Sequence, residues 1–485
     1  MNYLELLRLA LPEALVTVSA LVVLTVGLTK PRSTSVASAI AAAGLLLAGI
    51  AVFRLPETAS VVGSMLVISP LTSLFKLICL ALSFFTVFLA QNDAASRRHH
   101  AEYLAIILLA TVGLMLLVGS EELLTIFIGL ELTGLALYVL TAFDKASSRG
   151  AEAALKYFLF GSTASAFTLF GLSFIYGMSG STTLPEIAQR LAAAPAPPLL
   201  MAGIVMTLIG FAFKIAAAPF HLWAGDAYEA APIPSAAFIA SGSKVATFVV
   251  LGKVLLLALG PLHGNAAWHA MAAGWSPVLA AIAALSIVVG NLVALAQTNV
   301  RRLLAYSAVA HAGYTLLGLI AGGRDGFTAT LFYTTTYAFT LLGAFGVVAG
   351  VRRQTGGDDF AHFAGLRRRS PVLAGCMAVF MLSLAGLPPL AGFFGKFYLF
   401  AAALRSDASQ GLLWLVALAL LGSLISLYYY LSILKVIFAR EGEAAVPRVD
   451  GGWLQRVSVV ALAAIVIALG VVPSALVTRI LQSVP

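Results

Sequence analysis

Several charged residues lie in the middle of stretches that are otherwise as apolar as lipid. They are Glu131, Lys156, Lys214, Lys244 and Lys396, with Lys76 as a further candidate. A charge near the centre of a bilayer costs about 2.5–3.5 kcal/mol on insertion scales, so such residues normally face a bundle interior and serve a function. Lysines and a carboxylate in one membrane domain can exchange protons when their surroundings change. The chain is therefore predicted to contain a path for charge.

Glu131 and Lys156 are predicted to form an ion pair. Glu131 falls about ten residues into its apolar stretch, too far from either end to reach water. Lys156 falls at a similar depth on the following, antiparallel stretch. An opposite charge holds a lysine protonated, so a pair that opens and closes would switch the proton affinity of Lys156. A purely structural buried ion pair is the plain alternative.

Lys214 and Lys244 have no acidic residue in their own apolar stretches. Burial favours the neutral form of a lysine, which makes gain and loss of a proton both accessible, as a relay requires. The alternative is a long side chain that reaches the membrane surface while its stem stays in lipid. That alternative is the prediction for Lys253 and Lys435, which lie nearer the ends of their stretches, whereas Lys76 is left open.

Two histidines are candidates for the same path. His311 is well inside an apolar stretch and could bridge water molecules between two halves of the chain, although a core histidine bonded to a hydroxyl is the alternative. His221 lies beside a predicted helix break and could face an inner vestibule. The other five histidines lie in or beside predicted loops and are expected to be solvated.

The amino-acid composition indicates that this protein lies in a membrane. The 485 residues are 61% hydrophobic and only 10% charged, with a mean hydropathy of +1.00. Such values are outside the range of soluble domains and predict an all-α, polytopic membrane protein. No cleaved signal is expected, because no basic segment and cleavage site precede the first apolar stretch. Cys79 and Cys376 lie in apolar runs, and neither a disulfide nor a metal site is predicted.

About 20 apolar residues cross a bilayer as a helix, and this length divides the chain into fourteen spans. They are predicted at residues 11–29, 34–53, 70–90, 101–119, 121–142, 149–178, 199–222, 232–258, 275–297, 300–322, 326–350, 371–403, 411–438 and 455–481.

Basic residues gather in alternate loops, including Arg301 and Arg302, Arg352 and Arg353, and residues 367–369. Because Lys and Arg accumulate in cytoplasmic loops, both termini are predicted to lie on the opposite, outer side of the membrane. Most of the net charge of +9 then reflects topology and not a nucleic-acid surface.

Two predicted spans contain helix breakers. Pro219 follows Lys214 in the seventh span, and Pro388 and Pro389 precede Lys396 in the twelfth. Proline removes a backbone donor and interrupts a helix, and broken helices in corresponding positions indicate inverted repeats around a transport path. The chain is divided accordingly into a three-helix segment (1–100), a first repeat (101–258), a second, inverted five-helix repeat (275–438) and a C-terminal loop and helix (439–485).

Six motifs in order resemble the antiporter-like membrane subunits of respiratory complex I, most closely subunit N, the counterpart of mitochondrial NADH dehydrogenase subunit 2. They cover most of residues 120–400 and are FIGLEL at 127–132, ALKYF at 154–158, FKIAAAPFHLW at 213–223, DAYE at 226–229, QTNVRRLLAYS at 297–307 and SLAGLPPLAGFFGK at 383–396. Ala230 and Ser243 depart from the family's usual glycine and proline.

The resemblance implies a proton-pumping module of NADH:quinone oxidoreductase. Glu131 and Lys156 would be its modulating pair, Lys214 and Lys244 its central relay, His311 a participant in a water wire, and Lys396 the group that passes protons outward. NADH, FMN, iron–sulfur clusters and quinone would be bound by other subunits, with no cofactor or metal in this chain. Its partners would be the other membrane and peripheral subunits and the lipid bilayer, not nucleic acid.

Two other functions remain open from the sequence. Multisubunit sodium/proton antiporters contain a homologous chain, and co-purifying subunits would distinguish the two assemblies. A passive scaffold is the third possibility, and it predicts that Lys214→Ala and Glu131→Ala leave proton pumping intact.

Overall fold

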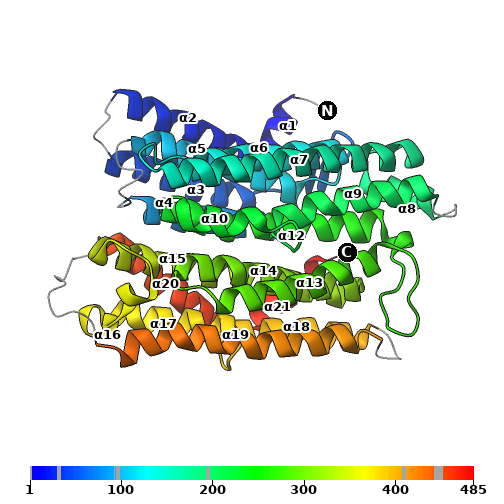
Figure 1. Cartoon of the computed structure of the whole chain (residues 1–485). Helices are drawn as coiled ribbons and strands as arrows, with labels where there is room; N and C mark the ends of the chain where they lie inside the picture. The colour runs from blue at the N-terminus through cyan, green and yellow to red at the C-terminus, as the bar shows by residue number, and fades with distance from the viewer. Residues whose placement is uncertain are drawn as a thin grey trace.

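The computed structural model describes residues 3–29, 34–91, 93, 99–192, 197–406, 411–441 and 452–484. Nearly all long helices run side by side along one direction, with the first half of the chain on one side of the bundle and the second half on the other (Figure 1). Within these residues, 12 helices are long and apolar enough to cross a membrane. They are α2 (Leu11–Thr29), α3 (Thr34–Phe53), α4 (Pro70–Ala90), α5 (His100–Gly119), α6 (Leu123–Thr141), α7 (Ser148–Ser179), the segment Ile233–Ala258, α13 (Trp275–Leu295), α14 (Val300–Ala321), α15 (Gly323–Thr355), α19 (Leu413–Ala439) and α20 (Trp453–Val471).

Both predicted helix breaks are confirmed. The seventh span consists of α9 (Pro198–Lys214) and α10 (Leu222–Ala230), and the twelfth of α17 (Pro371–Ala385) and α18 (Ala391–Arg405). Each break contains a cis X-Pro bond, at Ala218–Pro219 and at Pro388–Pro389. When each broken pair is counted as one span, the described helices account for the fourteen predicted spans. Lys214 is the last residue of α9, so a charged side chain stands where the backbone unwinds.

Two spans predicted as continuous are also interrupted. The eighth is divided into α11 (Ile233–Ala240), α12 (Gly242–Lys253) and a π-helical turn (Val254–Ala258). The fourteenth ends at Val471, and Pro473 starts a separate helix, α21 (Ser474–Ser483). Proline lacks the backbone N–H that would continue α20.

The remaining elements are short and lie between the spans. They are α1 (Tyr3–Leu9), the antiparallel strands β1 (Ala59–Val61) and β2 (Leu66–Ile68), α8 (Leu184–Leu191), the 3₁₀ turns Gly260–Leu262 and Phe360–Phe363, and α16 (Leu366–Arg369).

The centre of the bundle is formed by α14 and α15, whose apolar segments are almost completely buried. Glycines allow the closest helix contacts. A side chain at Gly171 of α7 would meet the Gly203 carbonyl and the Thr207 hydroxyl of α9, both nearer than 3.0 Å. The outward faces of α2, α7 and α19 expose large apolar side chains, as expected for surfaces in contact with lipid.

Candidate functional site

Lys214 is held against α6 at the break in the seventh span. Its Nζ donates a hydrogen bond of 3.1 Å to the carbonyl of Leu130 and lies 5.7 Å from the ring centroid of Tyr138. Gly134 is what leaves room for it, because a Cβ at that position would fall 2.4 Å from Nζ. Glu131 follows Leu130 directly, so the carboxylate and this lysine belong to one site.

The predicted pairing of Glu131 with Lys156 is wrong. The Glu131 carboxylate accepts a hydrogen bond from Ser165, which is nine residues beyond Lys156 on α7 and therefore about 13 Å farther along the helix axis. Lys156 instead pairs with Glu152 at 2.7 Å and with Asp226 of α10 at 2.9 Å. The reason is helix length: α7 has 32 residues and α6 only 19, so similar positions in the sequence do not lie at the same depth.

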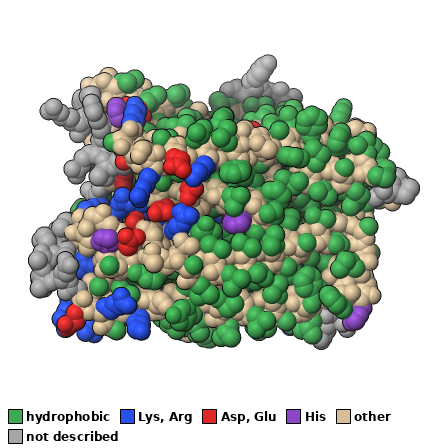
Figure 2. Space-filling model, viewed as in Figure 1, with side chains coloured by type: hydrophobic (Ala, Val, Ile, Leu, Met, Phe, Trp, Pro, Cys, Tyr) green, Lys and Arg blue, Asp and Glu red, His purple; other side chains and the backbone are tan. Residues whose placement is uncertain are grey.

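A charged cluster surrounds Lys156 at this end of the bundle. The guanidinium of Arg302 pairs with Asp226 and with Glu229, both at 2.9 Å. These side chains line a cavity of about 450 Å³ together with the beginning of α14 and the end of α15. Figure 2 shows acidic and basic side chains gathered at one end of this face, while the rest of the face is mainly apolar. We call this group the inner cluster, because its basic loops are those predicted to be cytoplasmic.

Asp358 follows α15 in the chain, and its side chain links the beginning of α14 to the end of α15 beside the inner cluster. Its carboxylate accepts hydrogen bonds from Asn299 at 2.8 Å and Arg352 at 2.9 Å and forms an ion pair with the buried Arg301. Burial acts to raise the pKa of Asp358, but the charges of Arg301 and Arg352 and the bond from Asn299 hold it below its usual value. The Arg301 guanidinium also donates to the carbonyl of Ala231, at the end of α10.

His221 lies in the break between Lys214 and the inner cluster. It is buried, and its ring lies 6.2 Å from that of Tyr306. Tyr306 is in turn covered by the guanidinium of Arg302, 5.9 Å from the ring centroid. The Nδ1 atom of His221 has no hydrogen-bond partner among the described residues. His221 therefore places a polar side chain between the inner cavity and the end of α9.

His311 lies between Lys244 and Lys396. On one side, Lys244 Nζ is 5.7 Å from the ring of Tyr337, which is 4.9 Å from the imidazole. On the other, Lys396 Nζ is 5.3 Å from the ring of Tyr314, which is 5.5 Å from the same imidazole. All three predicted residues are therefore brought into one row through the buried interior.

Both lysines of this row are bonded at helix backbones or hydroxyls. Lys244 Nζ donates to the carbonyl of Ala308 at 2.8 Å. Lys396 Nζ donates to the carbonyls of Leu384 and Ala385, both at 3.1 Å, and to the hydroxyl of Ser423 at 2.8 Å. The two carbonyls are freed by the break after α17, so the broken helix provides the binding site for this ammonium group.

Tyrosine hydroxyls complete the row, and the sequence interpretation did not identify them. Tyr333 OH lies 2.6 Å from His311 Nδ1 and Tyr430 OH 3.0 Å from Nε2. Tyr430 also contacts the hydroxyl of Ser307. A neutral imidazole has one donor and one acceptor nitrogen, and the two hydroxyls satisfy both. A tyrosine in an apolar helix usually indicates core packing, so nothing in the sequence assigned these residues to the path.

Two further lysines are buried, and for Lys253 this corrects the prediction. Lys253 does not reach the surface: it pairs with Glu121 at 3.1 Å and donates to the carbonyls of Val118 and Ser120. Lys76, left open above, pairs with Glu13 at 2.7 Å. Lys435 is exposed, as predicted. Glu13 is also buried, so a second carboxylate besides Glu131 lies within a span.

Comparison with known proteins gives a consistent result along the chain. The family model described as "NADH:quinone oxidoreductase/Mrp antiporter, TM" matches residues 120–426. NADH-quinone oxidoreductase subunit N 2 of Acidobacterium capsulatum is 48% identical, over 98% of both chains. A chain of respiratory complex I from Thermus thermophilus superposes with a TM-score of 0.80 at 34% identity, covering 96% of this chain and 98% of that one.

A chain of the Mrp complex from Dietzia has the same fold, with a TM-score of 0.84, at 20% identity over 98% of this chain and 97% of that one. The family match covers more than half of the residues and both broken helices, with all six candidate relay residues inside it. This chain belongs to the NADH:quinone oxidoreductase/Mrp antiporter family of membrane subunits.

Proposed function

We propose that this chain is the N-type membrane subunit of a bacterial NADH:quinone oxidoreductase and translocates protons across the inner membrane. The observation that carries the proposal is the set of buried lysines, Lys214, Lys244 and Lys396, with His311 in a row between the last two. Such groups are costly in a membrane interior and are retained where ions move. The identity to subunit N of Acidobacterium capsulatum supports this choice.

The proposed path begins at the inner cluster and ends beyond Lys396. Protons collect in the polar cavity around Asp226 and pass by way of His221 to Lys214. They continue to Lys244, His311 and Lys396 through water molecules between the side chains. Lys396 lies nine residues before the end of α18, and that end of the helix is on the side opposite the inner cluster. From Lys396 the proton leaves to the outside. Both chain termini would be periplasmic.

The switch differs from the one that the sequence suggested. Glu131 follows Leu130, whose carbonyl binds Lys214, and in this proposal its charge acts on the first lysine of the path. Lys156 pairs with both Glu152 and Asp226 within the inner cluster. A change in this cluster alters the field at the cytoplasmic opening, and Glu131 changes the proton affinity of Lys214. Electron transfer from NADH to quinone, with FMN and iron–sulfur clusters, is assigned to partner subunits.

Proton uptake by reconstituted vesicles tests the path. Lys214→Ala and Glu131→Ala in the whole complex are expected to slow NADH-driven proton transport on the order of a hundredfold, the usual contribution of a positioned acid–base group. Lys435→Ala is the matched control, because Lys435 is exposed on α19 and outside the path. If both path variants pump like the control, this chain is a scaffold and the proposal fails.

The alternative is a subunit of a sodium/proton antiporter, which the family description and the fold shared with the Mrp complex also allow. Affinity purification of the tagged chain from its native membrane separates the two. We expect NADH-oxidising subunits in the purified assembly. Sodium-dependent proton exchange by an assembly without NADH oxidation would support the antiporter instead.

A further inference from the structure

A second cavity lies at the end of the bundle opposite the inner cluster. Its volume is about 720 Å³, within the range of sites for small molecules. It is bordered by the β1–β2 hairpin, the N-terminal ends of α4, α6 and α15, and the end of α21. Helix α15 runs from Gly323 at this cavity to Arg352 at the inner cluster, so the two cavities are at opposite membrane surfaces. None of the proposed relay residues lines it.

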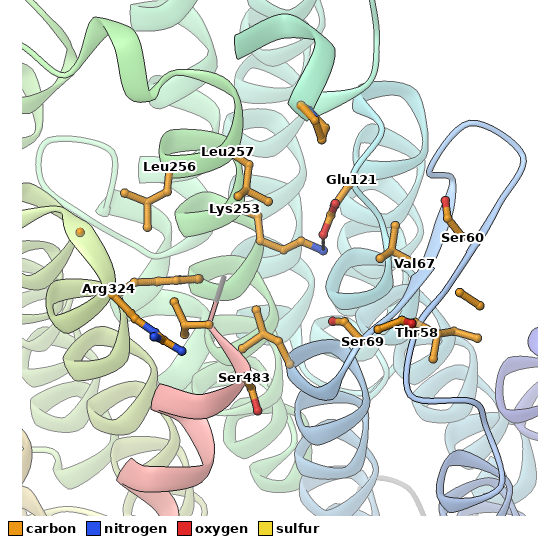
Figure 3. Close-up of a pocket in the computed structure, with 17 residues that line it drawn as sticks. Thr58, Ser60, Val67, Ser69, Glu121, Lys253, Leu256, Leu257, Arg324 and Ser483 are labelled. Atoms are coloured by element: carbon orange, nitrogen blue, oxygen red, sulfur yellow. Dashed lines mark ion pairs between the residues drawn. The ribbon is translucent and has the colours of Figure 1, made fainter. Parts of the chain in front are cut away.

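The walls of this outer cavity are mainly apolar. Leu71, Leu256, Leu257 and Phe327 contribute side chains from three separate spans, and Val67 contributes one from the hairpin. Figure 3 shows Leu256 and Leu257 on one side and the hairpin with Val67 on the other, with Lys253 and Glu121 between them. Walls of this kind favour an apolar ligand body, because burial of apolar surface is favourable at about 25 cal/mol per Å².

The charged residues that line the cavity, Glu121, Lys253 and Arg324, carry one net positive charge. Lys253 and Glu121 neutralise one another, and the other ammonium donors of Lys253 are taken by the carbonyls of Val118 and Ser120. Arg324 is exposed and has no ion-pair partner among the residues that the structure describes. Its neighbour Asp325 lines a different cavity. One guanidinium therefore remains to bind an anion at the rim, with the hydroxyl-bearing residues Thr58 and Ser60 also in the lining.

We propose that the outer cavity binds one phospholipid with an anionic headgroup. The phosphate is bound by Arg324, and the beginning of the acyl chains lies along Leu256, Leu257 and Phe327. An apolar cavity with a single free cation at the membrane surface matches the two ends of such a lipid. The lipid also covers the Lys253–Glu121 pair, whose carboxylate is the partly exposed member, and so excludes water from it.

Native mass spectrometry of the full chain in detergent, titrated with phosphatidylglycerol or phosphatidylcholine, tests this site. Arg324→Gln is expected to weaken phosphatidylglycerol binding about tenfold, the effect of losing one charge-assisted hydrogen bond. Phosphatidylcholine binding should weaken less, because its phosphate is already partly neutralised by its own choline cation. Ser60→Trp fills the cavity from an exposed strand position and is expected to abolish the specific binding of both lipids. Glycerol phosphate, which has the anion without the chains, should not compete.

Arg54→Gln is the matched control, because Arg54 is an exposed arginine at the same end of the bundle and is not part of the cavity lining. Equal thermal unfolding of all variants shows that the fold is retained. If Arg324→Gln and Arg54→Gln weaken phosphatidylglycerol binding equally, the lipid is attracted by unspecific surface charge, and the proposal is overturned. Full lipid binding by Ser60→Trp would mean that the lipid binds outside this cavity and would also overturn the proposal. So would displacement of the lipid by glycerol phosphate.

Discussion

Asp226 is the residue on which the inner cluster depends, because Lys156 and Arg302 bind its two carboxylate oxygens. A double-mutant cycle of Lys156→Met with Asp226→Asn should give a small stabilising coupling, since both side chains are partly exposed and solvent screens the pair. The cycle of Lys156→Met with Glu131→Gln should give none. Thermal unfolding in detergent measures both cycles. A larger coupling with Glu131 would restore the pairing predicted from sequence.

Residue types were more predictable than residue partners. Lys214, Lys244, His311 and Lys396 are buried in the interior, as their positions in apolar stretches indicated. The partner of Lys156 was not predictable, because it depends on how far α7 extends beyond α6. Lys253 was misjudged for a related reason. Its partner Glu121 precedes α6 by two residues and comes from a distant part of the chain, which no local pattern reveals.

The close contact between α7 and α9 should make the stability of the protein sensitive to a single added methyl group. Gly171→Ala would place a Cβ 2.5 Å from the Gly203 carbonyl, a backbone atom that cannot move without shifting α9. We expect a loss of about 1–3 kcal/mol in the free energy of unfolding, the usual cost of overpacking. Because α9 ends at Lys214, proton transport should fall as well. Denaturant unfolding in mixed micelles measures the first effect.

Gly177→Ala is the control on the same helix, since no atom lies within 4 Å of its added Cβ. Alanine is the better helix former, so this variant should be as stable as the wild type or up to about 1 kcal/mol more stable. Equal destabilisation by both substitutions would show that the glycines matter through helix flexibility and not through the close approach of α7 to α9.

The stability that Asp358 contributes by linking α14 to α15 should depend on pH. Its pKa is held below the usual value, so its contribution to stability is complete above the unfolded pKa of about 3.9 and is lost as pH falls through the lower folded value. Asp358→Asn leaves Arg301 buried without its counter-ion and should cost about 3 kcal/mol at pH 7. The difference in Tm between wild type and variant should narrow below about pH 4. A gap that stays constant from pH 7 to pH 3 would exclude this carboxylate as the cause.

At the scale of the whole molecule, the two cavities and the lysine row are organised by the central helices α14 and α15. The number of spans and both proline breaks followed from apolar length and from helix breakers, which are local properties of the sequence. The interruptions at Ser241 and Pro473 were not predicted, because each lies inside a stretch whose total length suits a single span, although polar residues or proline stand at both positions. Local hydrophobicity identifies a segment that can enter a membrane, but the depth of each residue is set by packing against other helices.

The orientation of the bundle can be tested with single cysteines, because the native Cys79 and Cys376 are both buried. If the inner cluster faces the cytoplasm, Met65→Cys in the exposed β1–β2 hairpin should react in intact cells with a maleimide that cannot cross the membrane. Arg367→Cys, exposed beside the inner cluster, should react only after the membrane is opened. The reverse pattern would invert the orientation. The outer cavity would then open toward the cytoplasm, and the proposed lipid would come from the inner leaflet.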